Sequence, residues 1–551
     1  MLLLAGLWFA VFFIFYITGI SFRRILAVLI KEKHDVRSQS IDETFFLGLL
    51  FIGGIVSISS IFFPIGNAAL AIVAGAALLQ VFFNFSKIRF DLNNMVNALR
   101  LTSKWELGVM LMVAFLTMTI AVSMILPGDT ALYYIQNIQW IRHFAVVPGL
   151  GNLHGRFAFN SHFLILSSLF SVFIKNTLIF PVNSVCFIVV VFTLYRETTR
   201  ALRKGSKWFG VFCGVSMLLI IRMLPEKLNT AAPDLICSLL IIYSFFFLIR
   251  SKLVYSKATD SIILNLLIFT CVSFKLSSVF LVLLLPFLWK GNVIRQVFLS
   301  IMVGAVILLP FLVRNYYLSG YLVYPFPALD IFSVDWKVPL DKVIEEKDWV
   351  ESWAKIPKLL PSQVVKLSMS EWLPRWFKGV GLFYQILLSV DLLGMGLLVV
   401  AYLKKQQMIM RLQLVVLVNL FFWFKMAPDP RFAIGFIAVQ FAFILASLLS
   451  NYEFFSADNL HFALIVALLV VFVQYRRYDK GFFADSALWL TPAPYVADSM
   501  VKVKRYHTNF DYQVPVMDDQ CYNLNLPCTP FANDKLMLRG TTLQNGFYIA
   551  K

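Results

Sequence analysis

The first residues that could do chemistry lie between positions 127 and 162. The string LPGDTALYY brings Asp129 and Tyr133 close together, and HGRFAFN adds His154, Arg156 and Asn160. A carboxylate can take a proton from a hydroxyl group, and an arginine can bind a phosphate through two parallel hydrogen bonds. Aromatic rings and side-chain amides suit contact with sugars. These residue types favour a site for a phosphorylated sugar, with Asp129 as the candidate catalytic residue.

The alternative interpretation of this stretch is structural. Aromatic side chains gather at membrane surfaces, and an aspartate can cap a helix there. For any single residue the two interpretations fit equally well. For the whole group a functional site is favoured, because a loop that only connects two helices rarely concentrates so many different polar groups.

Four further candidates stand at the predicted ends of apolar segments: Asp234 in NTAAPDL, Lys275 in FKLSS, Arg314 in RNYYLSGY and Arg431 in DPRF. An ionisable residue at membrane depth is costly, so it is by default a functional hypothesis. Lys275 interrupts an apolar run, which predicts two short helices that meet at an outward-facing turn with the cation pointing inward. For Lys275 and Arg314 the alternative is a side chain that extends to the lipid headgroups.

The elements that must position these residues are transmembrane helices. The chain has 551 residues, of which 60% are hydrophobic and only 14% are charged. This composition excludes a soluble globular domain, a disordered chain and a coiled coil. Uncharged runs long enough to cross a bilayer recur up to residue 474, and the first of them lacks the features of a cleaved signal peptide. The sequence therefore predicts an all-α polytopic membrane protein with about 12–14 transmembrane helices.

The distribution of Lys and Arg predicts how these helices are oriented. The formal net charge is +18, and most basic residues of the short loops lie inside if the N-terminus lies outside, as the positive-inside rule requires. The charge therefore needs no nucleic acid as a partner. This orientation places outside the membrane two loops of a membrane domain (1–474), at 127–176 and 314–381, and a tail at 475–551. In a bacterium the membrane would be the inner (plasma) membrane, and these pieces would face the periplasm.

The tail and the second loop carry fewer candidates. Short alternating runs and turn residues predict a small α/β or β-containing extracytoplasmic unit in the tail. Cys521 and Cys528 either form a disulfide, which an oxidising compartment permits, or remain two unpaired thiols. Acidic residues of the second loop, among them Glu346, are expected on a solvated helical face, while Asp330 and Asp335 stay undecided. Phosphate-binding, dinucleotide and zinc-protease motifs are missing from the sequence, so chemistry that consumes ATP directly is unsupported.

The strings PGDTALYY, VVPGLGNLHGRFAFNS, FKLSS, RNYYLSGYLVYP, DWKVP and DPRF form a pattern that extends over most of the chain. It resembles the GT-C superfamily of integral-membrane glycosyltransferases, and within it a group of bacterial multi-pass membrane proteins. PGDTALYY matches the position of the catalytic aspartate near the start of the first large extracytoplasmic loop of those enzymes. One difference is Thr130, which stands where many relatives carry a second acidic residue. A role that needs two adjacent carboxylates, such as holding a metal, is therefore unsupported.

The resemblance implies inverting transfer of a sugar from a polyprenyl-phosphate donor to an envelope glycan, lipid or protein at the outer face of the membrane, with no metal and no cofactor. Asp129 would act as the general base. Lys275, with Arg314 or Arg431, would neutralise the departing phosphate. The expected residues for substrate and phosphate binding are Lys275, Arg314, Arg431, His154, Arg156, Tyr133, Asn160 and Asp234.

Other functions remain open at this point. A polymerase or ligase of surface polysaccharide would share the lipid-linked donor but would depend more on Arg314 than on Asp129. A transporter of lipids or saccharides would need ionisable residues near the bilayer midplane rather than at the outer rim. A scaffold without catalytic activity would tolerate changes throughout the group from Asp129 to His162.

Overall fold

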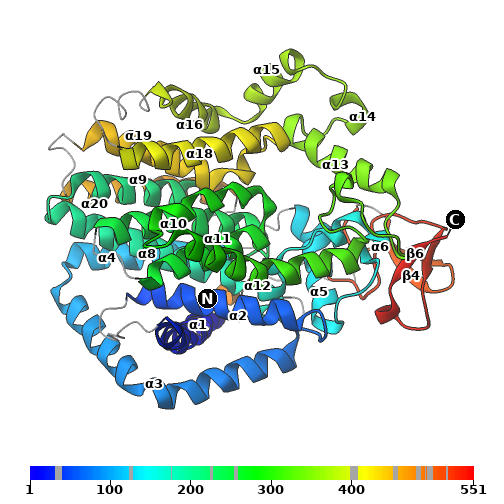
Figure 1. Cartoon of the computed structure of the whole chain (residues 1–551), viewed down its shortest axis with the longest axis horizontal. Coiled ribbons are helices and arrows are strands. Elements are labelled where there is room, and N and C mark those ends of the chain that lie inside the picture. The colour runs from blue at the N-terminus through cyan, green and yellow to red at the C-terminus, as the bar shows by residue number, and fades with distance from the viewer. Residues whose placement is uncertain are drawn as a thin grey trace.

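The computed structural model describes residues 1–30, 40–122, 128–174, 177–223, 227–253, 258–396, 407–450, 457–478, 486–490, 492, 501–516 and 519–550. Within these residues the protein is mostly helical, with small β-hairpins in the C-terminal region. Figure 1 shows the long helices packed side by side, while the strands β4 and β6 lie at one end of the molecule near α5 and α6.

Seven helices of the described residues are long and apolar enough to cross a membrane. They are α1 (Leu2–Leu29), α2 (Ile41–Ser59), α3 (Asn67–Leu101), α4 (Lys104–Val122), α10 (Pro233–Leu253), α12 (Val293–Ser319) and α18 (Gln407–Met426). Shorter apolar segments lie in α11 (Ala258–Phe274), η5 (Leu276–Leu288), α16 (Leu382–Leu393), α19 (Ile434–Leu449) and α20 (Ala457–Tyr478). The expectation of a polytopic helical membrane protein is confirmed. The predicted range of about 12–14 spans included shorter segments of this kind.

The interior of the bundle is built around α10. The apolar window of this helix is 94% buried, whereas the corresponding window of α3 is only 11% buried. Two further helices, α8 (Pro181–Arg203) and α9 (Lys207–Met223), pack beside α10, and the ring of Phe212 on α9 stacks on that of Phe443 on α19 at 5.2 Å. α10 therefore lies at the centre of the helix packing, whereas α3 lies at its surface.

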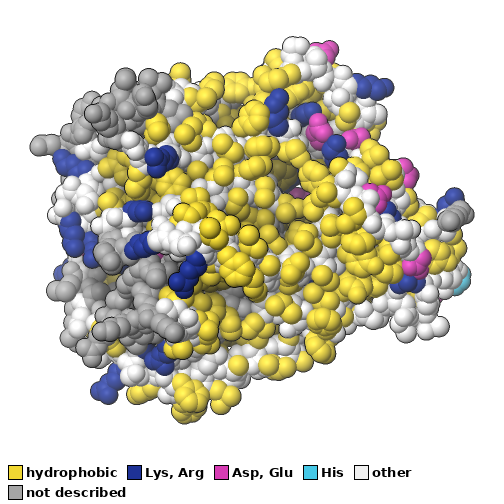
Figure 2. Space-filling model, viewed as in Figure 1, with side chains coloured by type: hydrophobic (Ala, Val, Ile, Leu, Met, Phe, Trp, Pro, Cys, Tyr) yellow, Lys and Arg dark blue, Asp and Glu magenta, His cyan; other side chains and the backbone are white. Residues whose placement is uncertain are grey.

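Figure 2 shows the surface that this packing leaves. Apolar side chains cover its middle, where lipid chains would contact them. Lys and Arg side chains occur at both ends of this face, whereas Asp and Glu side chains gather at the end that carries α13. The acidic side chains therefore distinguish the two ends of this face.

The first two helices cross at two glycines. A Cβ atom on Gly19 would lie 1.8 Å from the Thr44 carbonyl oxygen, and one on Gly48 would lie 1.7 Å from the Phe15 carbonyl oxygen. Helices in membranes gain most of their association from such close packing, because lipid provides little hydrophobic driving force. Any larger residue at either position would push α1 and α2 apart.

A buried carboxylate ties three helices together at the cytoplasmic end predicted by the charge pattern. Asp42 on α2 accepts hydrogen bonds from Tyr243 (2.8 Å) and Arg250 (3.1 Å) on α10 and from Arg196 (3.1 Å) on α8. A charge inside a membrane protein is tolerated when it is paired in this way. The sequence interpretation did not single out this group.

The two loops that the sequence predicts outside the membrane consist of short elements. In the first loop these are the π-helix η2 (Thr130–Tyr134), α5 (Ile135–His143), α6 (Leu150–Leu153), η3 (Gly155–Ala158), α7 (His162–Phe170) and the paired strands β1 (Val172–Ile174) and β2 (Thr177–Ile179). The second loop forms η6 (Pro327–Leu329), α13 (Leu340–Lys355), α14 (Pro361–Val364) and α15 (Met369–Gly379). A further turn, η7 (Pro430–Phe432), connects α18 to α19.

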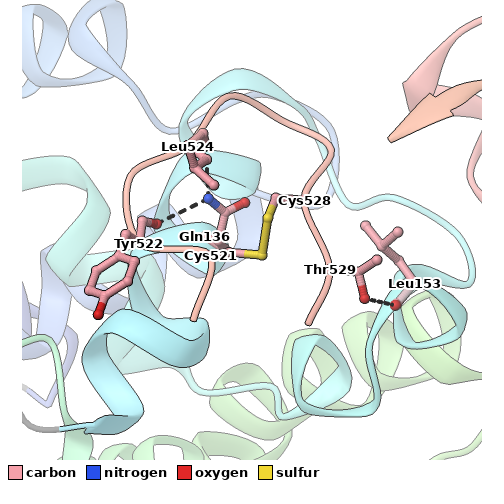
Figure 3. The surroundings of a disulfide bond; sticks show 7 residues. All are labelled: Gln136, Leu153, Cys521, Tyr522, Leu524, Cys528 and Thr529. Atoms are coloured by element: carbon pink, nitrogen blue, oxygen red, sulfur yellow. Dashed lines mark hydrogen bonds between the residues drawn. A yellow bond between two sulfur atoms is a disulfide. The ribbon is translucent and has the colours of Figure 1, made fainter. Parts of the chain in front are cut away.

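The tail is a set of small antiparallel hairpins joined by loops. After the short turn η8 (Ser486–Trp489), β3 (Val503–His507) pairs with β4 (Asp511–Pro515), and β5 (Leu536–Leu538) pairs with β6 (Phe547–Ile549) around the turn η10 (Leu543–Asn545). Cys521 and Cys528, which the sequence left as either a disulfide or two thiols, form a disulfide (Figure 3). The tail packs on the first loop, where the ring centre of Phe547 lies 5.8 Å from that of Trp140.

Candidate functional site

Asp129 stands between two arginines that come from different parts of the chain. Asp129 directly precedes the π-helix η2 and follows the end of α4 in the sequence. Oδ1 of Asp129 accepts a hydrogen bond from Nη1 of Arg156 (3.3 Å), and Oδ2 accepts one from Nη1 of Arg431 (3.1 Å). The carboxylate side chain remains 26% exposed. It is therefore fixed in orientation and still accessible to a substrate.

Arg156 connects Asp129 to the second loop. Its Nε donates to Oε1 of Glu346 on α13 (3.3 Å), and its guanidinium group lies 5.7 Å from the ring centre of Tyr133. Burial raises the pKa of Glu346, although the charge of Arg156 opposes this shift. Glu346 therefore differs from the solvated helical residue expected from the sequence: its side chain is 13% exposed and faces the first loop.

Arg431 is held by its own turn. Oδ1 of Asp429 accepts from the Arg431 backbone N–H (3.0 Å), and Oδ2 lies 2.8 Å from Nε of Arg431. The indole of Trp376 on α15 donates to the Pro428 carbonyl (2.6 Å), and the indole of Trp423 on α18 donates to the Asp429 carbonyl (2.8 Å). These bonds fix the backbone of the DPRF segment, so the guanidinium group needs little reorganisation to face Asp129.

A second carboxylate, Asp234, lies at the start of α10 with two lysines. Its Oδ2 pairs with Nζ of Lys227 at 2.9 Å, and its Oδ1 accepts from Nζ of Lys275. Lys275 is the residue between α11 and η5, so the predicted break into two short helices is confirmed.

We refer to Asp129, Arg156, Glu346, Asp429 and Arg431 as the Asp129 cluster, and to Asp234, Lys227 and Lys275 as the Asp234 cluster.

Phe432 lies between the two clusters. Nζ of Lys275 is 3.7 Å from the centre of its ring, and the guanidinium group of Arg431 is 4.9 Å from it. Burial alone would lower the pKa of Arg431, but the carboxylates of Asp429, Asp129 and Asp234 outweigh burial and raise it. Lys275 of one cluster and Arg431 of the other contact the same ring, so the two clusters adjoin each other and form one continuous site.

Arg314 and Asn160 occupy a different place. Arg314 is 4% exposed, and its Nη1 donates to the carbonyl and hydroxyl oxygens of Ser60 (3.0 Å each). Its Nε donates to Oδ1 of Asn160 (3.4 Å), and both side chains line a small cavity beneath the first loop. Of the two arginines considered as partners of Lys275, the structure brings Arg431, and not Arg314, into contact with Asp129.

Tyr133 is buried, and His154 is partly buried beside Arg156 in the sequence of the first loop. Burial, followed by the charge of Arg156, lowers the pKa of His154 to about 3, and its ring meets Phe157 edge-on at 5.1 Å. Burial and then the charge of Asp129 raise the pKa of Tyr133. Both rings are neutral at ordinary pH, and their contacts support Arg156 and the loop around it.

The joined clusters contain equal numbers of cations and carboxylates. The cations are Arg156, Arg431, Lys227 and Lys275, and the carboxylates are Asp129, Asp234, Glu346 and Asp429. A guanidinium group has five N–H donors, so donors remain for an anionic substrate after these pairs have formed. Within the residues that the structure describes, no group of three His, Cys, Asp or Glu side chains could hold a metal ion.

Sequence reasoning singled out five of these eight charged residues for the site, namely Asp129, Arg156, Asp234, Lys275 and Arg431, and missed the other three. Lys227 and Asp429 were not among the candidates taken from the sequence, in which Asp429 is the first residue of the string DPRF. Glu346 gave no local signal, because its partner Arg156 lies 190 positions away. An Asp-Pro-Arg turn between two apolar helices was the one local pattern that pointed to Asp429.

This arrangement defines a class: a multi-pass helical membrane protein with a network of ion pairs, partly open to solvent, at one end of its bundle. The chain belongs to the family described as domain of unknown function (DUF8201), which it matches over residues 1–438. This match identifies no glycosyltransferase family. It includes every residue of both clusters and leaves out the tail. No curated protein and no solved structure matches the chain.

Proposed function

We propose that the protein is an inverting glycosyltransferase that moves a sugar from a polyprenyl-phosphate donor to an envelope glycan, lipid or protein at the outer face of the membrane. The observation that carries this proposal is the Asp129 carboxylate, which is accessible yet held by two guanidinium groups close to the end of a membrane helix. The resemblance of PGDTALYY to the catalytic segment of GT-C enzymes supports the same assignment.

Asp129 acts as the general base in this mechanism. Each carboxylate oxygen has two lone pairs and uses one for an arginine, so another is free for the hydroxyl group of the acceptor. The acceptor oxygen attacks the anomeric carbon while its proton passes to Asp129. The bond between the anomeric carbon and the phosphate oxygen breaks, and its electron pair leaves with the polyprenyl phosphate.

The cations stabilise the leaving group. Charge develops on the phosphate as the bond breaks, and preorganised donors aimed at that charge lower the barrier. Arg431 and Lys275 are the nearest candidates, because both lie against the ring of Phe432 beside Asp129 and Asp234. Arg156 then has the role of orienting Asp129 and Glu346.

The test compares envelope glycans and polyprenyl-linked sugars by mass spectrometry in a deletion strain. The strain is complemented with wild type, with Asp129→Asn, or with Asp341→Asn, which makes the same change at an exposed position of α13 outside the clusters. We expect one sugar to disappear from a glycan while its lipid-linked precursor accumulates, and we expect only wild type and Asp341→Asn to restore it. Full complementation by Asp129→Asn at normal protein levels would refute the base assignment.

The same strains test the alternatives. If Arg314→Ala is more damaging than Asp129→Asn, a polymerase or ligase with the same donor becomes the better explanation. If the Asp129→Asn variant moves substrate across the membrane of reconstituted vesicles at the wild-type rate, a transporter becomes the better explanation. Either result would replace transfer at Asp129 as the proposed function.

A further inference from the structure

The disulfide loop of the tail contacts the segment that begins with Asp129. The backbone N–H of Tyr522 donates to the Ala131 carbonyl at 3.0 Å. In return, Nε2 of Gln136 donates to the carbonyl oxygens of Tyr522 (3.1 Å) and Leu524 (2.9 Å), as Figure 3 shows. Gln136 is fully buried by this contact. The Gln136 side chain therefore holds two carbonyl groups of the disulfide loop, and the loop in turn donates a hydrogen bond to the helix turn next to Asp129.

The helix turn that the disulfide loop contacts has an unusual hydrogen-bond geometry. Residues Thr130–Tyr134 form a π-helix, in which the N–H of Ile135 bonds to the Thr130 carbonyl. Such a wide turn is rare and occurs mostly as a local bulge in an α-helix, frequently at a functional site. The next carbonyl, that of Ala131, accepts a hydrogen bond from the tail. The tail thus donates a hydrogen bond to the π-helix itself.

The same tail also holds the segment that carries Arg156. The hydroxyl of Thr529, directly after the disulfide, donates to the Leu153 carbonyl at 2.7 Å. Farther along, the backbone N–H of Phe547 donates to the Pro148 carbonyl at 2.9 Å. Both partners of the Asp129–Arg156 ion pair are therefore flanked by contacts with the tail.

The disulfide keeps the loop in the shape that these contacts require. Cys521, Leu524 and Cys528 form a small buried cluster, and the bridge spans a sequence separation of only 7. Closing so short a loop removes many of its alternative conformations. The carbonyl groups of Tyr522 and Leu524 can then face Gln136 together without a further loss of conformational entropy.

We propose that the loop Cys521–Cys528 is a clamp that positions Asp129 and Arg156, and that the tail is needed for the activity of the site rather than for insertion of the bundle. Gln136 is accordingly a positioning residue. The catalytic consequence rests on the proposed function, whereas the effect on the order of residues 130–138 does not.

The test is amide hydrogen exchange on the full-length protein in lipid nanodiscs. Gln136→Met keeps the size of the side chain but removes both of its donated bonds, and the double variant Cys521→Ser with Cys528→Ser opens the loop. We expect exchange in residues 130–138 to rise about tenfold, the factor that corresponds to one lost hydrogen bond, with α10 unchanged. Arg539→Gln is the control, because Arg539 ties the tail to Asp335 and not to the π-helix. Unchanged exchange at 130–138 in both variants overturns the clamp.

A sugar-transfer assay on the same samples separates the two proposals. The clamp predicts that Gln136→Met lowers kcat with little change in KM, because Asp129 is misplaced while the donor-binding cations remain. A wild-type rate in Gln136→Met, despite faster exchange, overturns the positioning role. If wild type itself transfers no sugar while the exchange rises as expected, the clamp stands and the glycosyltransferase proposal fails.

Discussion

Replacing Asp234 by asparagine should destabilise the protein more than breaking any of its exposed ion pairs. Asp234 is shared by Lys227 and Lys275, and its side chain is 8% exposed. Asparagine keeps the size of the side chain but leaves two ammonium groups facing each other without a counter-charge. A partner removed from a buried ion pair leaves the remaining charges uncompensated in a poorly hydrated site.

The magnitude follows from the geometry. At 2.9 Å and an effective dielectric constant of roughly 20, the attraction between Asp234 and Lys227 is about 6 kcal/mol. Desolvation cancels much of this, and removing one partner of a buried pair typically costs about 3–5 kcal/mol. The contact of Lys275 with Phe432 survives and retains about 0.5–2 kcal/mol. We therefore expect a loss of about 3 kcal/mol in the free energy of unfolding.

The assay is unfolding of the purified protein in detergent, with two comparisons. Glu345→Gln breaks the exposed pair with Lys342 and should cost no more than about 1 kcal/mol. Adding Lys227→Met to Asp234→Asn should recover part of the loss, because one of the two unpaired cations is gone. The reasoning is refuted if Asp234→Asn is as mild as Glu345→Gln, or if the second change makes it worse.

One further prediction concerns Glu346 of the Asp129 cluster, and another concerns His154 in the first loop. Glu346→Gln keeps the shape of α13 but removes the charge that orients Arg156, so sugar transfer should fall about tenfold; an unchanged rate in the transfer assay would exclude a role for Glu346. Because burial and Arg156 lower the pKa of His154 to about 3, the native ring stays neutral while the unfolded ring binds a proton below about 6.5. Stability should therefore decrease as the pH falls from about 6.5 toward 3, and equal pH slopes for wild type and His154→Gln in thermal unfolding would contradict this.

The membrane bundle and the turn at Lys275 could be predicted because they follow from local sequence. Hydropathy over about twenty residues identifies a span, and a cation inside an apolar run marks a break. Asp129 was predicted from its position at the end of such a run. The sequence offered a disulfide between Cys521 and Cys528 as one of two possibilities, the other being two unpaired thiols, because these residues are close in sequence and remote from the apolar segments.

The partners of these residues could not be predicted, because they are brought together by the fold. Glu346 lies in a sequence rich in charges, typical of a solvated helix, and it is buried only because α13 packs against the first loop. The choice between Arg314 and Arg431 depends on which helix end faces Asp129, and neither sequence pattern reveals it. Gln136 had no signal either, since its two acceptors are backbone carbonyls 386 and 388 positions away.

The docking of β6 on the first loop has a consequence for how the protein is made. Asn152 donates to the Phe547 carbonyl across 395 positions. A ribosome adds about 5–20 residues per second, so roughly 20–80 seconds separate the synthesis of these two residues. Until β6 is made, the amide of Asn152 and the carbonyl of Pro148 lack their partners on Phe547. The arrangement of the first loop around these groups is therefore completed only late in synthesis, long after the helices that flank the loop have been made.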